Sequence, residues 1–131
     1  MTPTLMLVIY MAILTWLALL VASLIRVKGW TPSGTLLALG NRENLPAATP
    51  IAGRAERAAR NTLENFVLFA AIALVAHAAG ATSPKVATGA QIFFWARVLY
   101  LPVYCAGITY LRTAIWVVSI VGLGMMITGI L

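Results

Sequence analysis

Charged side chains are scarce in this sequence, and acidic ones are nearly absent. Nine of the 131 residues are Lys or Arg and three are Asp or Glu, so 9% of the chain is charged, whereas soluble domains carry about 25%. Hydrophobic residues make up 62% of the chain. The length suits one domain. This composition excludes an ordinary soluble domain and indicates an integral membrane protein.

Disulfide-forming and metal-binding side chains are also few. The single cysteine, Cys105, excludes a disulfide within the chain, and with one histidine, His77, no metal site is expected. The net charge of +6 raises the question of a nucleic-acid partner. The arginines stand singly among apolar residues, so membrane topology explains them better and no nucleic acid is expected.

Four long apolar segments predict an all-α fold, an integral membrane four-helix bundle that forms a single domain over residues 1–131. The first segment is uncharged and long enough to span a bilayer, so it is not a cleavable signal peptide. The link between the first two helices is rich in Gly and Pro, and we predict an ordered loop with short helical turns. Gly122 and Gly124 are expected to permit close helix contact. The predicted helices cover about residues 4–25, 54–79, 86–104 and 114–131.

Basic residues predict the orientation in the membrane. Most of them lie in or beside the first and third links, whereas the second link has only Lys85 and the N-terminal tail has none. Because Lys and Arg favour the cytoplasmic side, we predict that these two links face the cytoplasm and that both termini lie opposite. The basic residues of the two links are Arg26, Lys28, Arg42, Arg54, Arg57, Arg60 and Arg112.

The second predicted helix begins with a polar cluster that continues directly into the apolar residues 66–79. Arg57, Asn61 and Glu64 are spaced i, i+4 and i+7, which places them within about 40° of one another on one face. Arg60 lies to one side. Lipid cannot satisfy such groups, so they must face protein, water or a ligand. An alternative is a structural ion pair between Arg57 and Glu64.

The third predicted helix carries a second polar stripe, formed by Arg97, Tyr100 and Tyr104. Arg112 and Arg26 belong to the same membrane side. Together these groups predict a pocket with excess positive charge, suited to a polyanionic small molecule with amide groups. Taken alone, such tyrosines are more often membrane-interface residues than ligand contacts, and Arg112 is most simply a topology anchor.

These residues make the sequence similar, over nearly its whole length, to the MAPEG family, the membrane-associated proteins in eicosanoid and glutathione metabolism. The family pattern Arg-x-x-x-Asn-x-x-Glu is matched at residues 57–64, and an aromatic-rich run follows it at 66–69. The third-helix pattern Arg-x-x-Tyr-x-x-x-Tyr is matched at residues 97–104. Arg112 resembles the arginine that opens the fourth helix in the leukotriene and prostaglandin E synthase branches, although the stretch before it is one residue longer than in the leukotriene branch.

The resemblance implies a homotrimer that binds glutathione, as a co-substrate, between neighbouring subunits. Glutathione has two carboxylates, which arginines would bind, an ammonium for Glu64 and peptide groups for Asn61. Arg112 is the expected catalytic residue, because a nearby guanidinium stabilises the thiolate. Thr113 and Arg60 are expected to assist. The expected glutathione-binding residues are Arg57, Asn61, Glu64, Arg97, Tyr100, Tyr104 and, from a neighbouring subunit, Arg26.

The predicted function is a membrane glutathione transferase, with or without peroxidase activity, whose thiolate attacks a lipophilic electrophile from the bilayer. The alternative is a non-catalytic protein of the same family that binds lipid or glutathione, a branch that lacks the thiolate-activating arginine. A small multidrug exporter would need a carboxylate in its first helix, and residues 4–25 contain none. A structural membrane protein would leave the polar cluster without a purpose.

Overall fold

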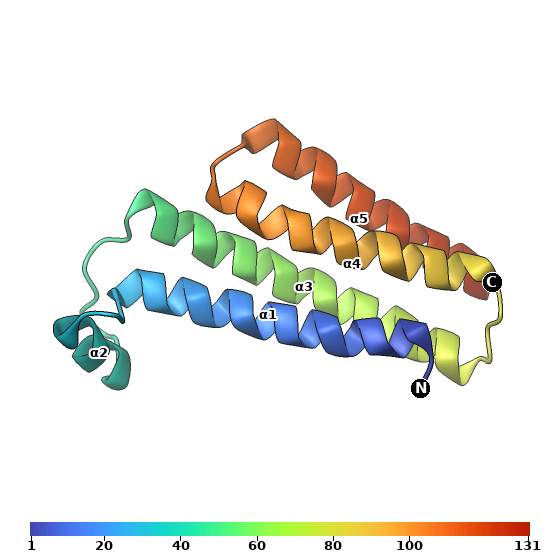
Figure 1. Ribbon diagram of the computed structural model, residues 1–131, viewed down its shortest axis with the longest axis horizontal. Coiled ribbons are helices and arrows are strands. Elements are labelled where there is room, and N and C mark those ends of the chain that lie inside the picture. The colour runs from blue at the N-terminus through green and yellow to red at the C-terminus, as the bar shows by residue number, and fades with distance from the viewer.

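The computed structural model describes residues 1–131 and consists of helices and their links (Figure 1). Each of the four long helices is long and apolar enough to cross a membrane. They lie side by side along the long axis of the molecule, which confirms the predicted all-α membrane four-helix bundle. A short helix, α2 (Pro32–Leu39), lies in the first link. The long helices are α1 (Pro3–Val27), α3 (Pro50–Ala78), α4 (Pro84–Cys105) and α5 (Thr109–Ile130).

The first four helices begin with the same two-residue signal, a Thr or Ser followed by Pro. The hydroxyl oxygen accepts a hydrogen bond from a backbone N–H of the first turn, and the proline occupies the first helical position, where no N–H is needed. This signal explains why α3 begins at residue 50 and not at 54 as predicted. The four pairs are Thr2-Pro3, Thr31-Pro32, Thr49-Pro50 and Ser83-Pro84.

The link between α4 and α5 is shorter than predicted. Gly107 has a left-handed φ of 79°, which turns the chain sharply after the end of α4. As a result α5 begins at Thr109 and not at residue 114. Arg112 therefore lies in the first turn of α5, and not in the link where the sequence pattern had placed it.

The apolar core occupies the half of the bundle that contains both termini. The rings of Phe69 and Phe93 stack with their centres 4.5 Å apart. Met11, Leu123 and Met126 are buried in the same cluster, so α1, α3, α4 and α5 all contribute to it. This half of the bundle supplies the hydrophobic packing, and it leaves the other half for polar groups.

Glycines allow α4 and α5 to approach closely. A Cβ atom on Gly122 would lie 2.7 Å from the carbonyl oxygen of Gly89 and 2.9 Å from the backbone nitrogen of Phe93. The predicted role of Gly122 is therefore confirmed. Within one chain Gly124 does not have this role, because a Cβ atom there would have nothing within 4 Å. Gly124 instead lies on the exposed side of the helix.

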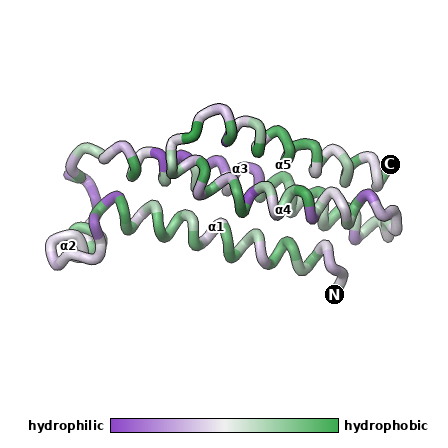
Figure 2. Tube along the Cα trace, turned by 45° about the horizontal axis from the view of Figure 1, so that its top comes forward, coloured by the Kyte–Doolittle hydropathy of each residue, from purple (hydrophilic) through white to green (hydrophobic).

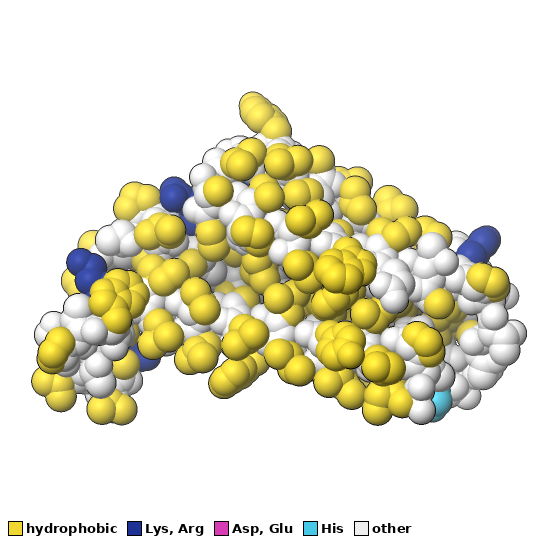
Figure 3. All heavy atoms as spheres, in the orientation of Figure 1, with side chains coloured by type: hydrophobic (Ala, Val, Ile, Leu, Met, Phe, Trp, Pro, Cys, Tyr) yellow, Lys and Arg dark blue, Asp and Glu magenta, His cyan; other side chains and the backbone are white.

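Hydrophobic side chains cover most of the visible side of the bundle, whereas basic side chains appear near its ends (Figure 3). The link from α1 to α3 and the link from α4 to α5 lie at one end, and both termini lie near the other (Figure 1). Hydrophilic residues concentrate along part of α3, within the bundle (Figure 2). The polar half of the bundle therefore adjoins the basic links.

Candidate functional site

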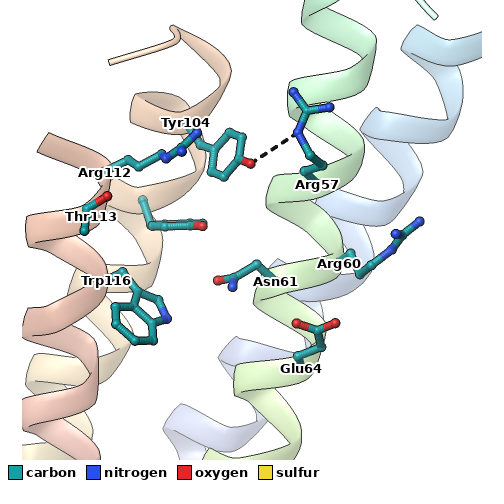
Figure 4. A pocket seen from close by; sticks show the side chains of 9 residues that line it. Arg57, Arg60, Asn61, Glu64, Tyr104, Arg112, Thr113 and Trp116 are labelled. Carbon is teal, nitrogen blue, oxygen red and sulfur yellow. Dashed lines mark hydrogen bonds between the residues drawn. The ribbon is translucent and has the colours of Figure 1, made fainter. Parts of the chain in front are cut away.

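A cavity of about 360 Å³ lies between α3, α4 and α5, in the half of the bundle next to the basic links (Figure 4). Polar side chains from three helices converge there, within an otherwise apolar bundle, which makes the cavity the candidate site. All of the residues nominated from the sequence line it except Arg26 and Arg97. The lining residues are Arg57, Arg60, Asn61, Glu64, Tyr100, Tyr104, Arg112, Thr113 and Trp116.

On the α3 wall of the cavity, Asn61 lies towards the centre and Arg60 lies at the rim. Asn61 points across the cavity towards α5, whereas Arg60 points away from α5 (Figure 4). Arg60 forms an ion pair with Glu56 at 3.7 Å, with the two side chains 67% and 52% exposed. A pair this exposed contributes little to stability. Arg57 and Glu64 form no ion pair, so the alternative of a structural salt bridge between them is not realised within the chain.

Tyr104 joins arginines from two other helices. Its hydroxyl oxygen accepts a hydrogen bond from Nε of Arg57 at 3.3 Å (Figure 4). The guanidinium carbon of Arg112 lies 4.4 Å from the centre of the Tyr104 ring, within the range of a cation–π contact. A phenol therefore positions both guanidinium groups at the cavity wall and neutralises neither of them.

The cavity lining carries excess positive charge, as the sequence predicted. It contains three arginines and one carboxylate, that of Glu64. The only ion pair in the chain is the one at the rim, so Arg57 and Arg112 have no carboxylate partner. No three His, Cys, Asp or Glu side chains gather at one place. The lining therefore offers two unpaired cations to an anionic ligand and one carboxylate to a cationic group.

Arg97 lies behind the cavity wall and does not line the cavity. The side chain is completely buried, with 0% exposure. Its Nη2 atom donates hydrogen bonds to Oδ1 of Asn61 at 2.9 Å and to Oγ1 of Thr62 at 2.7 Å. Its guanidinium carbon lies 3.9 Å from the centre of the Tyr100 ring. Arg97 thus contacts two lining residues, Asn61 and Tyr100, from behind. It does not line the cavity itself, because α3 covers it at this point of α4.

The guanidinium of Arg97 is an unusual buried group. Its Nε and Nη1 atoms have no hydrogen-bond partner, and no carboxylate pairs with it. Burying a cation without a counter-charge is costly, and proteins retain such groups mainly where they serve a site. The stacking on Tyr100 and the two hydrogen bonds of Nη2 offset part of this cost.

Arg26 also lies outside the cavity. It is near the end of α1, where it lines a separate cavity of about 500 Å³ with Ser23 and Arg42. Its Nη1 atom is buried and has no hydrogen-bond partner. Within one chain, therefore, Arg26 is not part of the site formed by α3, α4 and α5, and its expected role depends on assembly with another subunit.

Trp116 is the lining residue that sequence reasoning missed. It follows Arg112 by four residues, so the two side chains share one face of α5. That spacing was the available signal. Thr113 lines the cavity as nominated, and its hydroxyl donates to the carbonyl oxygen of Thr109 at 3.2 Å. The Thr113 oxygen can therefore act towards a ligand as an acceptor.

Comparison with known proteins supports a family assignment. No curated protein and no solved structure matches the chain. The family model described as the MAPEG family matches residues 3–131, which is essentially the whole chain. This match agrees with the membrane four-helix bundle. The chain therefore belongs to the MAPEG family, a family of membrane proteins that includes glutathione transferases and synthases.

Proposed function

We propose that the protein is a membrane glutathione S-transferase. The observation that carries this proposal is the cavity between α3, α4 and α5, in which Arg57 and Arg112 have no carboxylate partner and Glu64 is the single carboxylate. Glutathione has two carboxylates, one ammonium and one thiol, so its charges complement this lining. Membership of the MAPEG family supports the same class of ligand.

Each charged group of glutathione has a candidate partner in the cavity. Arg57 would bind a carboxylate, and Glu64 would bind the ammonium, since the lining contains no other carboxylate. Asn61 would hold a peptide or carboxylate oxygen, and the hydroxyl groups of Tyr100 and Tyr104 would complete the polar contacts. Arg97 would act through Asn61 and Tyr100, and would not touch glutathione itself.

Arg112 is the residue that we assign to catalysis. A thiol has an ordinary pKa of about 8.5, and a neighbouring guanidinium lowers that pKa because it stabilises the negative sulfur. The proton of the thiol leaves to solvent. The thiolate then attacks an electrophilic carbon of the co-substrate, a carbon–sulfur bond forms, and the leaving group departs with its electron pair. Tyr104 would hold Arg112 in place through the cation–π contact.

The co-substrate would come from the bilayer. The helices around the cavity present apolar side chains to their surroundings, so a lipophilic electrophile can partition into the membrane and approach laterally. The same thiolate would also attack the O–O bond of a lipophilic hydroperoxide, which leaves as the alcohol, and a second glutathione would convert the resulting sulfenic acid into the disulfide and water. The positive-inside rule favours a cytoplasmic position for the end of the bundle that carries this cavity, with both termini opposite.

Assembly as a homotrimer would complete the site. The cavity is open on one side of the chain, and Arg26 lies at a different side of the bundle with a buried Nη1 atom that has no partner. A neighbouring subunit can bring its Arg26 to the open side, where this guanidinium would bind the second carboxylate of glutathione. Such an interface would also remove polar side chains from lipid.

Titration of the detergent-purified protein with glutathione tests the proposal directly. We expect saturable thiolate absorbance in the ultraviolet at neutral pH, and conjugation of glutathione to a chlorinated dinitrobenzene. Binding without thiolate formation and without turnover for several electrophiles would instead favour the non-catalytic function of a lipid- or glutathione-binding protein. Absence of glutathione binding would contradict both functions.

A further inference from the structure

The short helix α2 has an exposed apolar face that no other part of the chain covers. α2 contains no charged residue, and among the helices it contacts only α1. Leu36 and Leu39 lie one turn apart and are 73% and 80% exposed, and Trp30, just before α2, is 69% exposed. Three large apolar side chains therefore protrude from one short segment of the first link.

α2 is fixed firmly against the end of α1. The hydroxyl of Thr31 accepts a hydrogen bond from the Gly34 nitrogen at 3.0 Å and donates one to the Lys28 carbonyl oxygen at 2.8 Å. The Thr35 hydroxyl donates to the Gly29 carbonyl oxygen at 3.0 Å. A Cβ atom on Gly34 would overlap the Lys28 carbonyl oxygen, so only glycine permits this approach. These contacts therefore fix the orientation of the apolar face of α2 relative to α1.

The position of α2 matches the edge of the lipid bilayer. α2 projects from the bundle beside the end of α1, at the end that carries the basic links (Figures 1 and 3). α1 is a membrane span up to Val27, so the residues that follow leave the hydrocarbon at this level. Leu20 and Leu24 on α1 are 39% and 40% exposed, and they extend the lipid-facing surface towards α2.

The charged residues around α2 suit a layer of lipid phosphates. Lys28 precedes α2 and Arg42 follows it, and both are exposed. Arg42 also donates a hydrogen bond to the Ser23 hydroxyl at 2.7 Å, which ties the far side of α2 back to α1. Glu43 is the only acidic residue between α1 and α3. Basic residues beside an apolar helix face are typical of segments that lie in the plane of a membrane.

We propose that α2 is an interfacial helix, which inserts Trp30, Leu36 and Leu39 into the boundary between headgroups and acyl chains of the bilayer that the bundle spans. The partner of this surface is the lipid itself. The insertion fixes the depth of the end of α1, and with it the level of Arg26 relative to the membrane. This proposal is independent of the catalytic activity proposed above.

Fluorescence quenching in vesicles tests the proposal. In the full-length protein with Cys105→Ser, the variants Leu36→Cys and Leu39→Cys are labelled with an environment-sensitive fluorophore and reconstituted in phosphatidylcholine, with and without brominated acyl chains. Leu20→Cys is the reference for lipid, and Asn44→Cys, in the same link, is the reference for water. We expect brominated lipid to quench positions 36 and 39 nearly as strongly as position 20, with about fivefold less quenching by iodide than at position 44.

Two results would overturn the proposal. If iodide quenches positions 36 and 39 as strongly as position 44, the apolar face lies in water. If neither iodide nor brominated lipid quenches them, another protein copy covers the face. A label-free measurement avoids any effect of labelling on the fold. The emission of Trp30 is the difference between the tryptophan emission of the wild type and that of Trp30→Phe. Lipid brominated near the headgroups should quench this emission. Emission from Trp30 that brominated lipid leaves unchanged would contradict the proposal independently.

Discussion

Arg97 and Asn61 form a hydrogen bond that fixes the orientation of the Asn61 amide. The Oδ1 atom of Asn61 accepts from Nη2 of Arg97 at 2.9 Å and from Nδ2 of Asn65 at 3.2 Å. Nδ2 of Asn65 also donates to the Asn61 backbone carbonyl at 2.8 Å. Because two donors occupy its oxygen, the NH2 group of Asn61 is the part of the amide that is free for a ligand, and it suits a carbonyl or carboxylate oxygen.

Replacement of Arg97 by methionine should therefore affect the ligand more than the fold. Methionine fills a similar volume and removes a buried cation that has no carboxylate partner, so thermal stability should stay equal or rise. Glutathione affinity should fall about tenfold, which corresponds to about 1.4 kcal/mol, because Asn61 is free to turn its oxygen towards the ligand. Isothermal titration and thermal melting in detergent measure the two effects.

Thr62→Val is the companion variant for this buried group. It removes one of the two acceptors of Nη2 and leaves the cation in place, so stability should fall by about 1–3 kcal/mol. A destabilised Arg97→Met together with a neutral Thr62→Val would mean that Arg97 stabilises the fold and does not position Asn61.

Glu64→Gln and Arg57→Ala should each weaken glutathione binding and leave folding intact. Neither side chain is part of an ion pair, so neither change leaves an opposite charge unpaired. Each removes a charge-assisted contact with the ligand that is worth about 1.5–3 kcal/mol. Glu56→Gln is the matched control, because Glu56 does not line the cavity and its pair with Arg60 is exposed at the rim, so this variant should keep wild-type affinity. Loss of the folded assembly in both cavity variants would indicate a structural role instead.

Native mass spectrometry from a mild detergent should show three copies of the chain. The reason is that the Arg26 guanidinium and the open side of the cavity lie at separate places on one chain, and an interface brings such surfaces together. Arg26→Ala should lower glutathione affinity and keep the trimer, since it removes only the expected contact with the second carboxylate. A monomer that still binds glutathione with wild-type affinity would refute the assembly.

Gly122→Ala should destabilise the bundle, and Gly124→Ala should not. The methyl group at position 122 would approach backbone atoms of Gly89 and Phe93 to less than 3.0 Å, and overpacking of this kind costs about 1–3 kcal/mol. At position 124 the methyl group has open space and alanine favours the helix, so stability should stay level or rise slightly. Thermal melting of both variants in the same detergent compares them directly. Equal melting temperatures would show that α4 and α5 can separate without cost.

The membrane spans and most of the cavity lining could be predicted because they follow from composition and helical periodicity. Arg57, Asn61 and Glu64 share a face of α3 for the same geometric reason that the pattern predicted. Helix starts were harder to predict. The start of α3 depends on the Thr49 hydroxyl, and the start of α5 on the left-handed turn at Gly107, and both are local features that average hydropathy does not record.

The depth of each side chain could not be predicted from periodicity. Arg97 and Tyr104 lie on one stripe of α4, yet Tyr104 lines the cavity and Arg97 is completely covered. The difference arises from tertiary packing, because Asn61 and Thr62 of α3 lie against Arg97. Gly89 escaped notice for the same reason: its partner Gly122 belongs to another helix.

Arg112→Ala is the variant that separates an enzyme from a binding protein. Its guanidinium is held on the Tyr104 ring at the cavity wall and has no carboxylate partner. Its interaction with sulfur is strong only when the thiol has lost its proton, so its removal should act on the reactive state more than on binding. We expect affinity for glutathione to change by less than about tenfold and turnover to fall by about one to three orders of magnitude.

The pH–rate profile for conjugation to a chlorinated dinitrobenzene provides the decisive measurement for Arg112. A cation near the sulfur lowers the thiol pKa, so the wild-type rate should reach its plateau at a pH well below the ordinary thiol pKa of about 8.5. In Arg112→Ala the rise should shift towards that ordinary value, and the loss of rate should therefore be largest near neutral pH and shrink as the pH increases. Arg42→Ala, which removes an arginine from the first link, is the control and should retain the wild-type profile. An Arg112→Ala protein with unchanged rate and profile would exclude this guanidinium from thiolate formation, and Tyr104 would then be the group to test.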